Sequence, residues 1–340
     1  MLRKLLQRAD LGGDALAPAP PVISIVVIVY DMAEQAEKTV RSLFLDYQQG
    51  VHAEDYEVIV VENESPRPMA KAFINSLPAN FQYHYRVDAE ASPAAAINFG
   101  ARQARGQHIC VMIDGARMLT PGVVRNMLLG HQLSPRAVVS VPGYHLGAEL
   151  QQLAVNSGYC SAEEARLLAS IDWPLDGYRL FDISCFSGSC APGFFLPNSE
   201  SNCISLPRNL WQELQGFDEQ FDLSGGGLIN LDFYKRACEL PGIKHVICIG
   251  EGTFHQFHGG VTTGGQATEA RNAYIEAARA QYREIRGAEF VSPQTQPLFL
   301  GEISANAMPF LQESIARVDC LRALVPEKVP APPLVRVADA

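Results

Sequence analysis

The chain has 340 residues and a formal net charge of −10, because 27 lysine and arginine residues stand against 37 aspartate and glutamate residues. This acidic composition, with no block of basic residues, argues against DNA or RNA as the main partner. Hydrophobic residues make up 47% of the chain, which is enough for a large buried core. No apolar stretch reaches the roughly 20 residues that span a bilayer.

The amino-terminal residues and the cysteines both favour a cytoplasmic location. The first residues, MLRKLLQRADLGG, lack the apolar core and the cleavage site of a secretion signal. The eight cysteines form no CxxC pair, and several lie in apolar runs such as HICVMI and VICIG. Small buried thiols are the ordinary interpretation of that pattern. We therefore expect a reducing, cytoplasmic environment.

Strands and helices are predicted to alternate through the first part of the chain. Residues 22–30 (VISIVVIVY) are almost all apolar and β-branched, which is typical of a strand buried on both faces. The elements predicted after it are a helix over 33–48, a strand over 56–61, a further helix, a strand near 82–86, a helix over about 93–104 and a strand over 108–113. This order predicts an α/β fold with a mostly parallel sheet covered by helices on both faces.

The pattern changes after a strand predicted over 137–142. Residues 145–201 are irregular around one predicted helix (162–171), and so long a loop-rich region is usually functional. Predicted after it are helices over 208–215 and 228–239, a strand over 244–249 and a helix over about 268–286. We divide the chain into an N-terminal segment and linker (1–21), a main domain (22–265) with an insertion (145–201), a C-terminal helical extension (266–325) and a disordered tail (326–340).

Polar clusters follow two of the predicted strands directly. Glu62 and Asn63 end the second strand, and Asp114 and Arg117 follow the strand over 108–113. Ligands of parallel sheets bind beyond the carboxyl ends of the strands. We therefore expect these four residues around one crevice, although ordinary turn residues would give the same pattern.

Several common enzyme classes lack their signatures here. The turn after the first strand, YDMAEQ, has no glycine, whereas dinucleotide sites need a glycine-rich turn there. Neither a P-loop nor a GxSxG nucleophile turn is present. Oxidoreductase, P-loop kinase and α/β-hydrolase functions are therefore disfavoured.

Four segments together resemble family 2 glycosyltransferases of the GT-A fold. They are ISIVVIVYDM, YEVIVVENES, SPAAAINFGARQARGQHICVMIDGAR and LPRNLWQELQGFDEQF, in the order that the family shows. The resemblance implies a GT-A domain that transfers a sugar from a nucleotide-diphosphate sugar to a hydroxyl acceptor such as a glycan or glycoconjugate. It implies that Glu62 and Asn63 bind the nucleoside and that the insertion lies on the acceptor side.

The family's metal-binding DxD motif is degenerate in this chain. It becomes Asp114-Gly115-Ala116, so a single carboxylate remains to hold the divalent cation, Mn²⁺ or Mg²⁺, that neutralises the leaving diphosphate. Arg117 could add positive charge as a phosphate ligand. The resemblance also implies that a late histidine completes the metal site, and FHQFHGG offers His255 and His258.

The family's general base is missing from its usual place. The Glu-Asp pair that supplies it falls on Ile229-Asn230, and asparagine cannot accept a proton. Asp232 is the provisional base for an inverting transfer, although a shift of two residues turns a helical side chain by about 200°. Glu200 and Glu219 are the other candidates, and a retaining reaction would need no such base. The alternative function is a non-catalytic module that keeps the fold and binds a nucleotide-sugar or a glycan.

Overall fold

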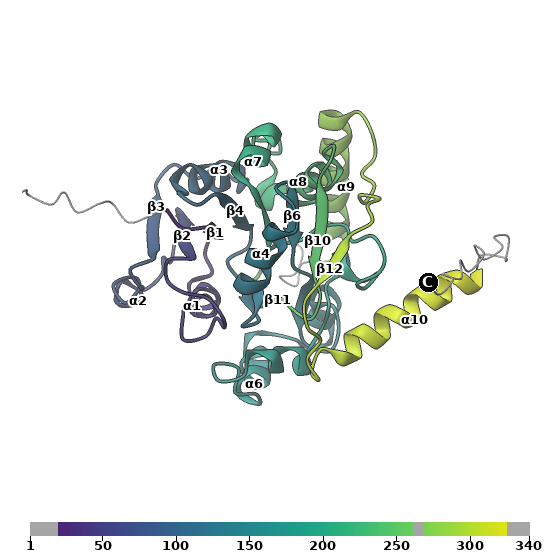
Figure 1. The fold of residues 1–340 in the computed structure, drawn as a ribbon, viewed down its shortest axis with the longest axis horizontal. Helices are drawn as coiled ribbons and strands as arrows, with labels where there is room; N and C mark the ends of the chain where they lie inside the picture. The colour runs from purple at the N-terminus through teal and green to yellow at the C-terminus, as the bar shows by residue number, and fades with distance from the viewer. Residues whose placement is uncertain (1–19, 261–267, 325–340) are drawn as a thin grey trace, which may run out of the picture.

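The computed structural model describes residues 20–260 and 268–324. Within these residues the central sheet contains eight strands, in the order β12-β10-β6-β9-β4-β1-β2-β3 (Figure 1). Their bounds are β1 (Ile23–Val29), β2 (Tyr56–Asn63), β3 (Phe81–Arg86), β4 (His108–Met112), β6 (Ala137–Ser140), β9 (Ile204–Pro207), β10 (Lys244–Cys248) and β12 (Leu298–Leu300). Among the described strands of this sheet, β9 alone runs antiparallel to its neighbours, β4 and β6. The expectation of a mostly parallel sheet is confirmed.

Helices cover both faces of this sheet because its central strands are apolar on both sides. In β1, Ile25 and Val27 pack into the core on one face, and Val26 and Ile28 pack into the core on the other. The first core contains residues of α1 (Ala33–Arg41), α2 (Lys71–Ile74) and α4 (Val123–Gln132), and the second contains residues of α3 (Ala94–Gln103), α7 (Arg208–Leu214), α8 (Ile229–Glu239) and α9 (Thr268–Arg286). Alternation of side chains along a strand produces these two layers.

A smaller sheet of four strands carries part of the insertion. Its order is β5-β11-β7-β8, with β5 (Arg117–Leu119), β7 (Gly143–Leu146), β8 (Ser184–Phe186) and β11 (Thr253–His255). The insertion also forms the helices α5 (Gln151–Ala154) and α6 (Ser161–Ala169). Stacked aromatic rings fix this sheet, since Tyr144 lies 5.1 Å from the ring centres of both Phe186 and Phe254.

Some predicted elements differ from the structure. The helix expected over 33–48 ends at Arg41 and continues as turns, α4 was not predicted, and Arg117 lies in strand β5 instead of in a turn. The C-terminal extension is not purely helical, because β12 pairs with β10 in the central sheet and only then leads to α10 (Met308–Leu324), which extends away from the body (Figure 1). Most of segment 1–21 and the tail 326–340 lie outside the described residues.

In the part of the chain that the structure describes, no helix is long and apolar enough to cross a bilayer. All eight cysteines fall in that part and are free thiols.

Candidate active site

A cavity of about 980 Å³ opens at the carboxyl ends of β1, β2 and β4. This is the edge at which ligands of parallel sheets bind. Side chains from several elements line this cavity. Residues from the strand ends, the insertion, α8, α9 and the segment after β11 contribute, among them Tyr30, Asp31, Asn63, Glu64, Asp114, Arg117, His145, Glu200, Asn230, His255, His258 and Arg271.

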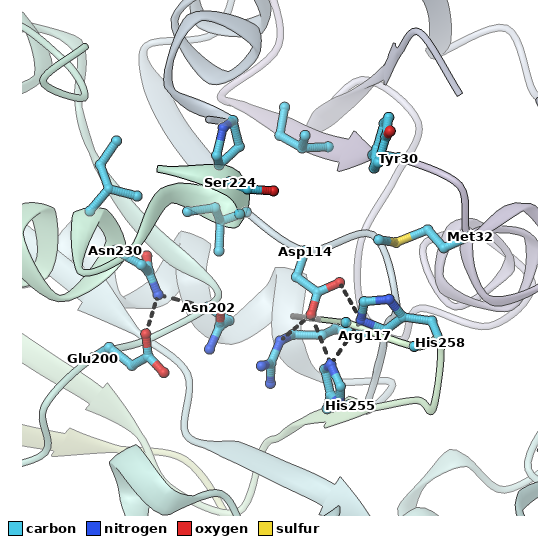
Figure 2. Close-up of a pocket in the computed structure, with 18 of the residues that line it drawn as sticks. Tyr30, Met32, Asp114, Arg117, Glu200, Asn202, Ser224, Asn230, His255 and His258 are labelled. Carbon is cyan, nitrogen blue, oxygen red and sulfur yellow. Dashed lines mark hydrogen bonds and ion pairs between the residues drawn. The ribbon is translucent and has the colours of Figure 1, made fainter. Parts of the chain in front are cut away.

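Asp114 occupies the centre of this lining. It follows β4 by two residues, and its Oδ1 accepts a hydrogen bond from the backbone N–H of Ala116 at 3.0 Å. Gly115 lets the chain turn closely past β1, because a Cβ there would lie 2.6 Å from the carbonyl oxygen of Ile28. The turn therefore presents the Asp114 carboxylate toward the cavity (Figure 2).

The small sheet brings two histidines to Asp114. His255 of β11 pairs with Arg117 of β5, and its Nε2 lies 3.1 Å from Asp114 Oδ2. His258 follows three residues later, with its Nε2 3.7 Å from Asp114 Oδ1 and 3.1 Å from His255 Nε2. One ligand atom from each of these residues lies within 4.8 Å of the others (Figure 2). The structure thus brings together Asp114, His255 and His258, as the sequence analysis expected.

Burial and the carboxylate set the protonation of this cluster. Burial by itself would raise the pKa of Asp114, but His258 and His255 hold that pKa well below its usual range. Burial lowers the pKa of His255 to about 4, against the opposing effect of Asp114. Burial also disfavours the charged form of His258, yet the Asp114 carboxylate outweighs it and raises the pKa of that histidine.

A glutamine from the insertion fixes the tautomer of His255. Gln151 Nε2 donates to the carbonyl oxygens of Leu146 and His255, so its Oε1 must be the acceptor that faces His255 Nδ1 at 2.6 Å. Nδ1 therefore carries the proton, and the lone pair of Nε2 points at Asp114. Metal-bound histidines commonly have such a partner on the other ring nitrogen.

This donor set fits a divalent transition metal. A carboxylate oxygen and two imidazole nitrogens converge on one point, and imidazole binds transition metals better than it binds Mg²⁺. The convergence of the Asp114 oxygen and the neutral His255 nitrogen would be repulsive without a proton or a cation between them. Asp114, His255 and His258 could therefore hold a metal ion that faces the cavity.

Arg117 places a buried cation beside this cluster. Its side chain is 8% exposed, and its Nε lies 3.5 Å from Asp114 Oδ2. Among the described residues, neither Nε nor Nη1 has a hydrogen-bond partner. Leaving such donors buried and unpaired is costly. Because Arg117 also lines the cavity, its positive charge would attract an anion that binds there.

The ends of β1 and β2 form the opposite wall of the cavity. Asn63 lines it, with its Oδ1 accepting from Arg86 Nη1 at 3.0 Å. Asp31 and Glu64, which follow the two strands, have positive φ angles of 49° and 55°. This backbone conformation costs free energy in residues other than glycine, and such strain concentrates at functional sites.

Glu62, expected beside Asn63, faces away from the cavity. It is fully buried, and its Oε2 accepts from the backbone N–H of Met69 and from the hydroxyl of Tyr83. It does not belong to the cavity lining. Successive side chains of a strand point to opposite faces, so only Asn63 of this pair can face a ligand. Glu62 can act on it only through the position of β2.

Asp232, expected to be the general base, lies in an ion-pair network away from the cavity lining. Its carboxylate is 1% exposed and binds Arg236 of α8 at 2.7 Å and Arg286 of α9 at 2.7 Å. Arg286 also binds Asp218 at 2.8 Å. A carboxylate held by two guanidinium groups is poorly suited to accept a proton, so this placement argues against the expected role.

Glu200 is the carboxylate that meets α8 at the cavity. It comes from the loop before β9, and its Oε2 accepts from Nδ2 of Asn230 at 2.7 Å (Figure 2). Asn202 lies beside this pair, with its Oδ1 3.3 Å from the same nitrogen. All three residues line the cavity. Glu219, the other candidate, accepts from Asn98 outside the lining.

Other functional residues escaped the sequence analysis. Asp31 follows β1 directly, so the strand-end rule that found Asp114 could also have found it. His145 and Gln151 have no such signal, because they come from the irregular insertion. Glu164 of α6 is similar, since its Oε2 accepts from the backbone N–H of Phe257 at 2.6 Å and so supports the turn that carries His258.

One part of the chain matches a known family, and this part builds the first half of the site. Residues 24–188, just under half of the chain, match the family model described as glycosyl transferase family 2. The match includes Asn63, Asp114 and Arg117 and ends before Glu200, Asn230 and the two histidines.

Several solved structures are similar to the chain. One is S. aureus TarS, residues 1–349, at 11% identity and TM-score 0.45, covering 89% of this chain and 73% of that chain. Another is the same TarS segment in complex with UDP-GlcNAc, at 11% identity and TM-score 0.46, covering 87% and 72%. A third is the mannosyltransferase PcManGT from Pyrobaculum calidifontis in complex with GDP-Man and Mn²⁺, at 14% identity and TM-score 0.47, covering 92% and 79%. No curated protein sequence matches the chain.

Proposed function

We propose that this glycosyltransferase moves a sugar from a nucleotide-diphosphate sugar to a hydroxyl acceptor, a glycan or glycoconjugate, with inversion at the anomeric carbon. One observation carries the proposal. Arg117 is a lining residue of a large cavity, its Nε and Nη1 lack hydrogen-bond partners among the described residues, and it lies directly beside the convergent ligand atoms of Asp114, His255 and His258. A diphosphate would pair with the arginine, and a divalent cation would pair with the other three residues.

The residues divide the donor between them. Asn63, together with the strained turns at Asp31 and Glu64, forms the nucleoside side of the cavity. Arg117 binds the phosphates. Asp114, His255 and His258 would hold the cation, Mn²⁺ in preference to Mg²⁺ because two of the ligands are imidazoles. When bound, the metal supplies positive charge that stabilises the leaving diphosphate.

The alternative, a module that binds a nucleotide-sugar or glycan without catalysis, has two observations in its favour. Asn230 occupies the position of the family's base, and Asp232 is tied to two arginines. The cavity nevertheless retains a carboxylate at the same place, Glu200, which gives a transferase the proton acceptor it needs.

A nucleotide screen tests the proposal. Melting temperatures are measured with UDP, GDP, CDP and dTDP, each with Mn²⁺, with Mg²⁺ and with EDTA. A ligand at about a hundred times its dissociation constant stabilises the folded state by about 2.7 kcal/mol. We expect one nucleotide to raise the melting temperature, and to raise it most with Mn²⁺. No shift with any nucleotide would contradict the proposed donor class.

A further inference from the structure

The carboxylates of the cavity fall into two groups. Asp31 and Glu64 follow β1 and β2, Glu90 belongs to the segment after β3, and Asp114 belongs to the cluster with His255 and His258. Among the described lining residues, Glu200 is the remaining carboxylate. In Figure 2 it lies on the far side of Asp114 from Tyr30 and Met32, next to Asn230 and Asn202. Glu200 therefore lies away from the nucleoside wall, on the side from which an acceptor would enter.

The surroundings of Glu200 leave one oxygen able to accept a proton. Asn230 Nδ2 holds its Oε2 at 2.7 Å, and the same nitrogen lies 3.3 Å from the carbonyl oxygen of Ser201 and from Oδ1 of Asn202. Within the described residues, no lysine or arginine pairs with Glu200, and nothing donates a hydrogen bond to its Oε1. Asp232, by contrast, has both oxygens occupied by arginines.

Asn230 stands where the family resemblance places the catalytic aspartate, in the first turn of α8. Its amide cannot accept a proton, but it can orient a neighbouring carboxylate. The acid and its hydrogen-bonded neighbour are thus both present at this place, with the acid on the loop before β9 instead of on α8. We propose that Glu200 is the general base of this transferase and that Asn230 is its positioning residue, an inference that rests on the proposed function.

The step that follows is a single displacement. The acceptor oxygen forms a bond to the anomeric carbon of the donor sugar while its proton passes to Oε1 of Glu200. The bond between that carbon and the phosphate oxygen breaks, and the nucleoside diphosphate leaves with the electron pair. Arg117 stabilises the charge that develops on the phosphate. Glu200 then returns its proton to solvent, which restores the starting state.

Exchanging the two side chains tests this assignment. Glu200→Gln removes the base, and Glu200→Gln with Asn230→Asp moves the carboxylate to α8 while preserving an amide–carboxylate pair. Turnover is measured as release of nucleoside diphosphate with water as the acceptor. The donors tested are sugar derivatives of the nucleotide that binds in the screen, UDP-GlcNAc and GDP-mannose among them. Glu219→Gln, outside the cavity, is the matched control.

We expect Glu200→Gln to lower kcat about 10²- to 10⁴-fold, with nucleotide affinity within twofold of wild type. The double variant should have a kcat at least tenfold higher than that of Glu200→Gln, and Glu219→Gln should have the kcat of the wild type. A purely structural role for Asn230 would not give this recovery.

The possible failures are distinguishable. Turnover by Glu200→Gln within threefold of wild type would overturn the base assignment and leave the proposed function standing. No recovery in a double variant that binds nucleotide normally would overturn the pairing of Glu200 with Asn230. Nucleotide binding by the wild type without turnover of any donor would overturn the inference and favour the non-catalytic module. Absence of nucleotide binding would remove the proposed function itself.

Discussion

The two sides of the cavity are built in different ways. On the donor side, Asn63 and Asp114 stand within two residues of strand ends, so the parallel sheet itself places them together. On the acceptor side, Glu200 and Asn230 come from segments thirty residues apart and meet through a side-chain hydrogen bond. Strand order therefore positions the proposed donor site, whereas tertiary contacts position the proposed base.

Arg117 offers the largest test of the donor side. Arg117→Met keeps most of the side chain's volume and removes the unpaired donors. Because hydrogen bonds to charged groups contribute about 1.5–3 kcal/mol, we expect nucleoside diphosphate affinity to fall about 10- to 100-fold in calorimetric titrations. Arg102→Met, at an exposed position of α3 outside the cavity, controls for net charge. Equal losses in both variants would show that Arg117 acts only through the overall charge.

Asp232 provides a contrast with Glu200, because it is a carboxylate of α8 that does not line the cavity. Asp232→Asn weakens the charged hydrogen bonds to the partly exposed Arg236 and Arg286, and we expect the free energy of unfolding in urea to fall by about 2 kcal/mol. Nucleotide affinity and turnover of the folded variant should stay at wild-type values. Asp218→Asn, which loses one contact to Arg286, should cost less. A folded Asp232→Asn variant without turnover would return the base to Asp232.

Glu164 links the insertion to the turn that carries His258. We expect its substitution to have the smallest effect on stability. Burial raises the pKa of Glu164 to about 7, against hydrogen bonds from Phe257 and Tyr159 that lower it. The folded state therefore binds a proton more tightly than the unfolded state, in which the pKa is near 4.5. This contribution is fully present below about pH 4.5 and is lost as the pH rises through about 7.

Unfolding measurements at pH 5 and pH 8 detect this effect. From pH 5 to pH 8 the free energy of unfolding should fall less in Glu164→Gln than in the wild type, and the difference should be on the order of 1–2 kcal/mol. Glu163→Gln, at a half-buried position of the same helix, should follow the wild type, because Arg166 lowers the pKa of Glu163. Parallel behaviour of Glu164→Gln and wild type would show that Glu164 is ionised in the fold throughout this range.

Much of the donor side could be predicted from the sequence. Buried β-branched runs identify β1, β2 and β4, and polar residues at their ends identify Asn63 and Asp114. Glu62 shows where the rule stops, because adjacent strand residues face opposite ways and the sequence does not say which one faces the ligand. Arg117 was found at the right place, although it lies in the short strand β5, whose three residues carry no periodic signal.

The acceptor side could not be predicted in the same way. The helical spacing already marked Asp232 as a poor substitute for the base, but only the fold shows its two arginine partners. The contact between Glu200 and Asn230 joins an irregular loop to a helix. His145 pairs with His255 in the small sheet, which forms from distant segments, and Gln151 hydrogen-bonds to the His255 ring. Such contacts depend on how the chain packs, which no local pattern encodes.

The most direct test of the metal and phosphate assignment is a calorimetric titration of the nucleoside diphosphate found in the screen. It is carried out with Mn²⁺ and with EDTA, on the wild type and on Asp114→Asn. We predict that Mn²⁺ tightens nucleotide binding at least tenfold in the wild type and has no effect in the variant. Equal nucleotide affinities of the two proteins in the presence of Mn²⁺ would contradict the account.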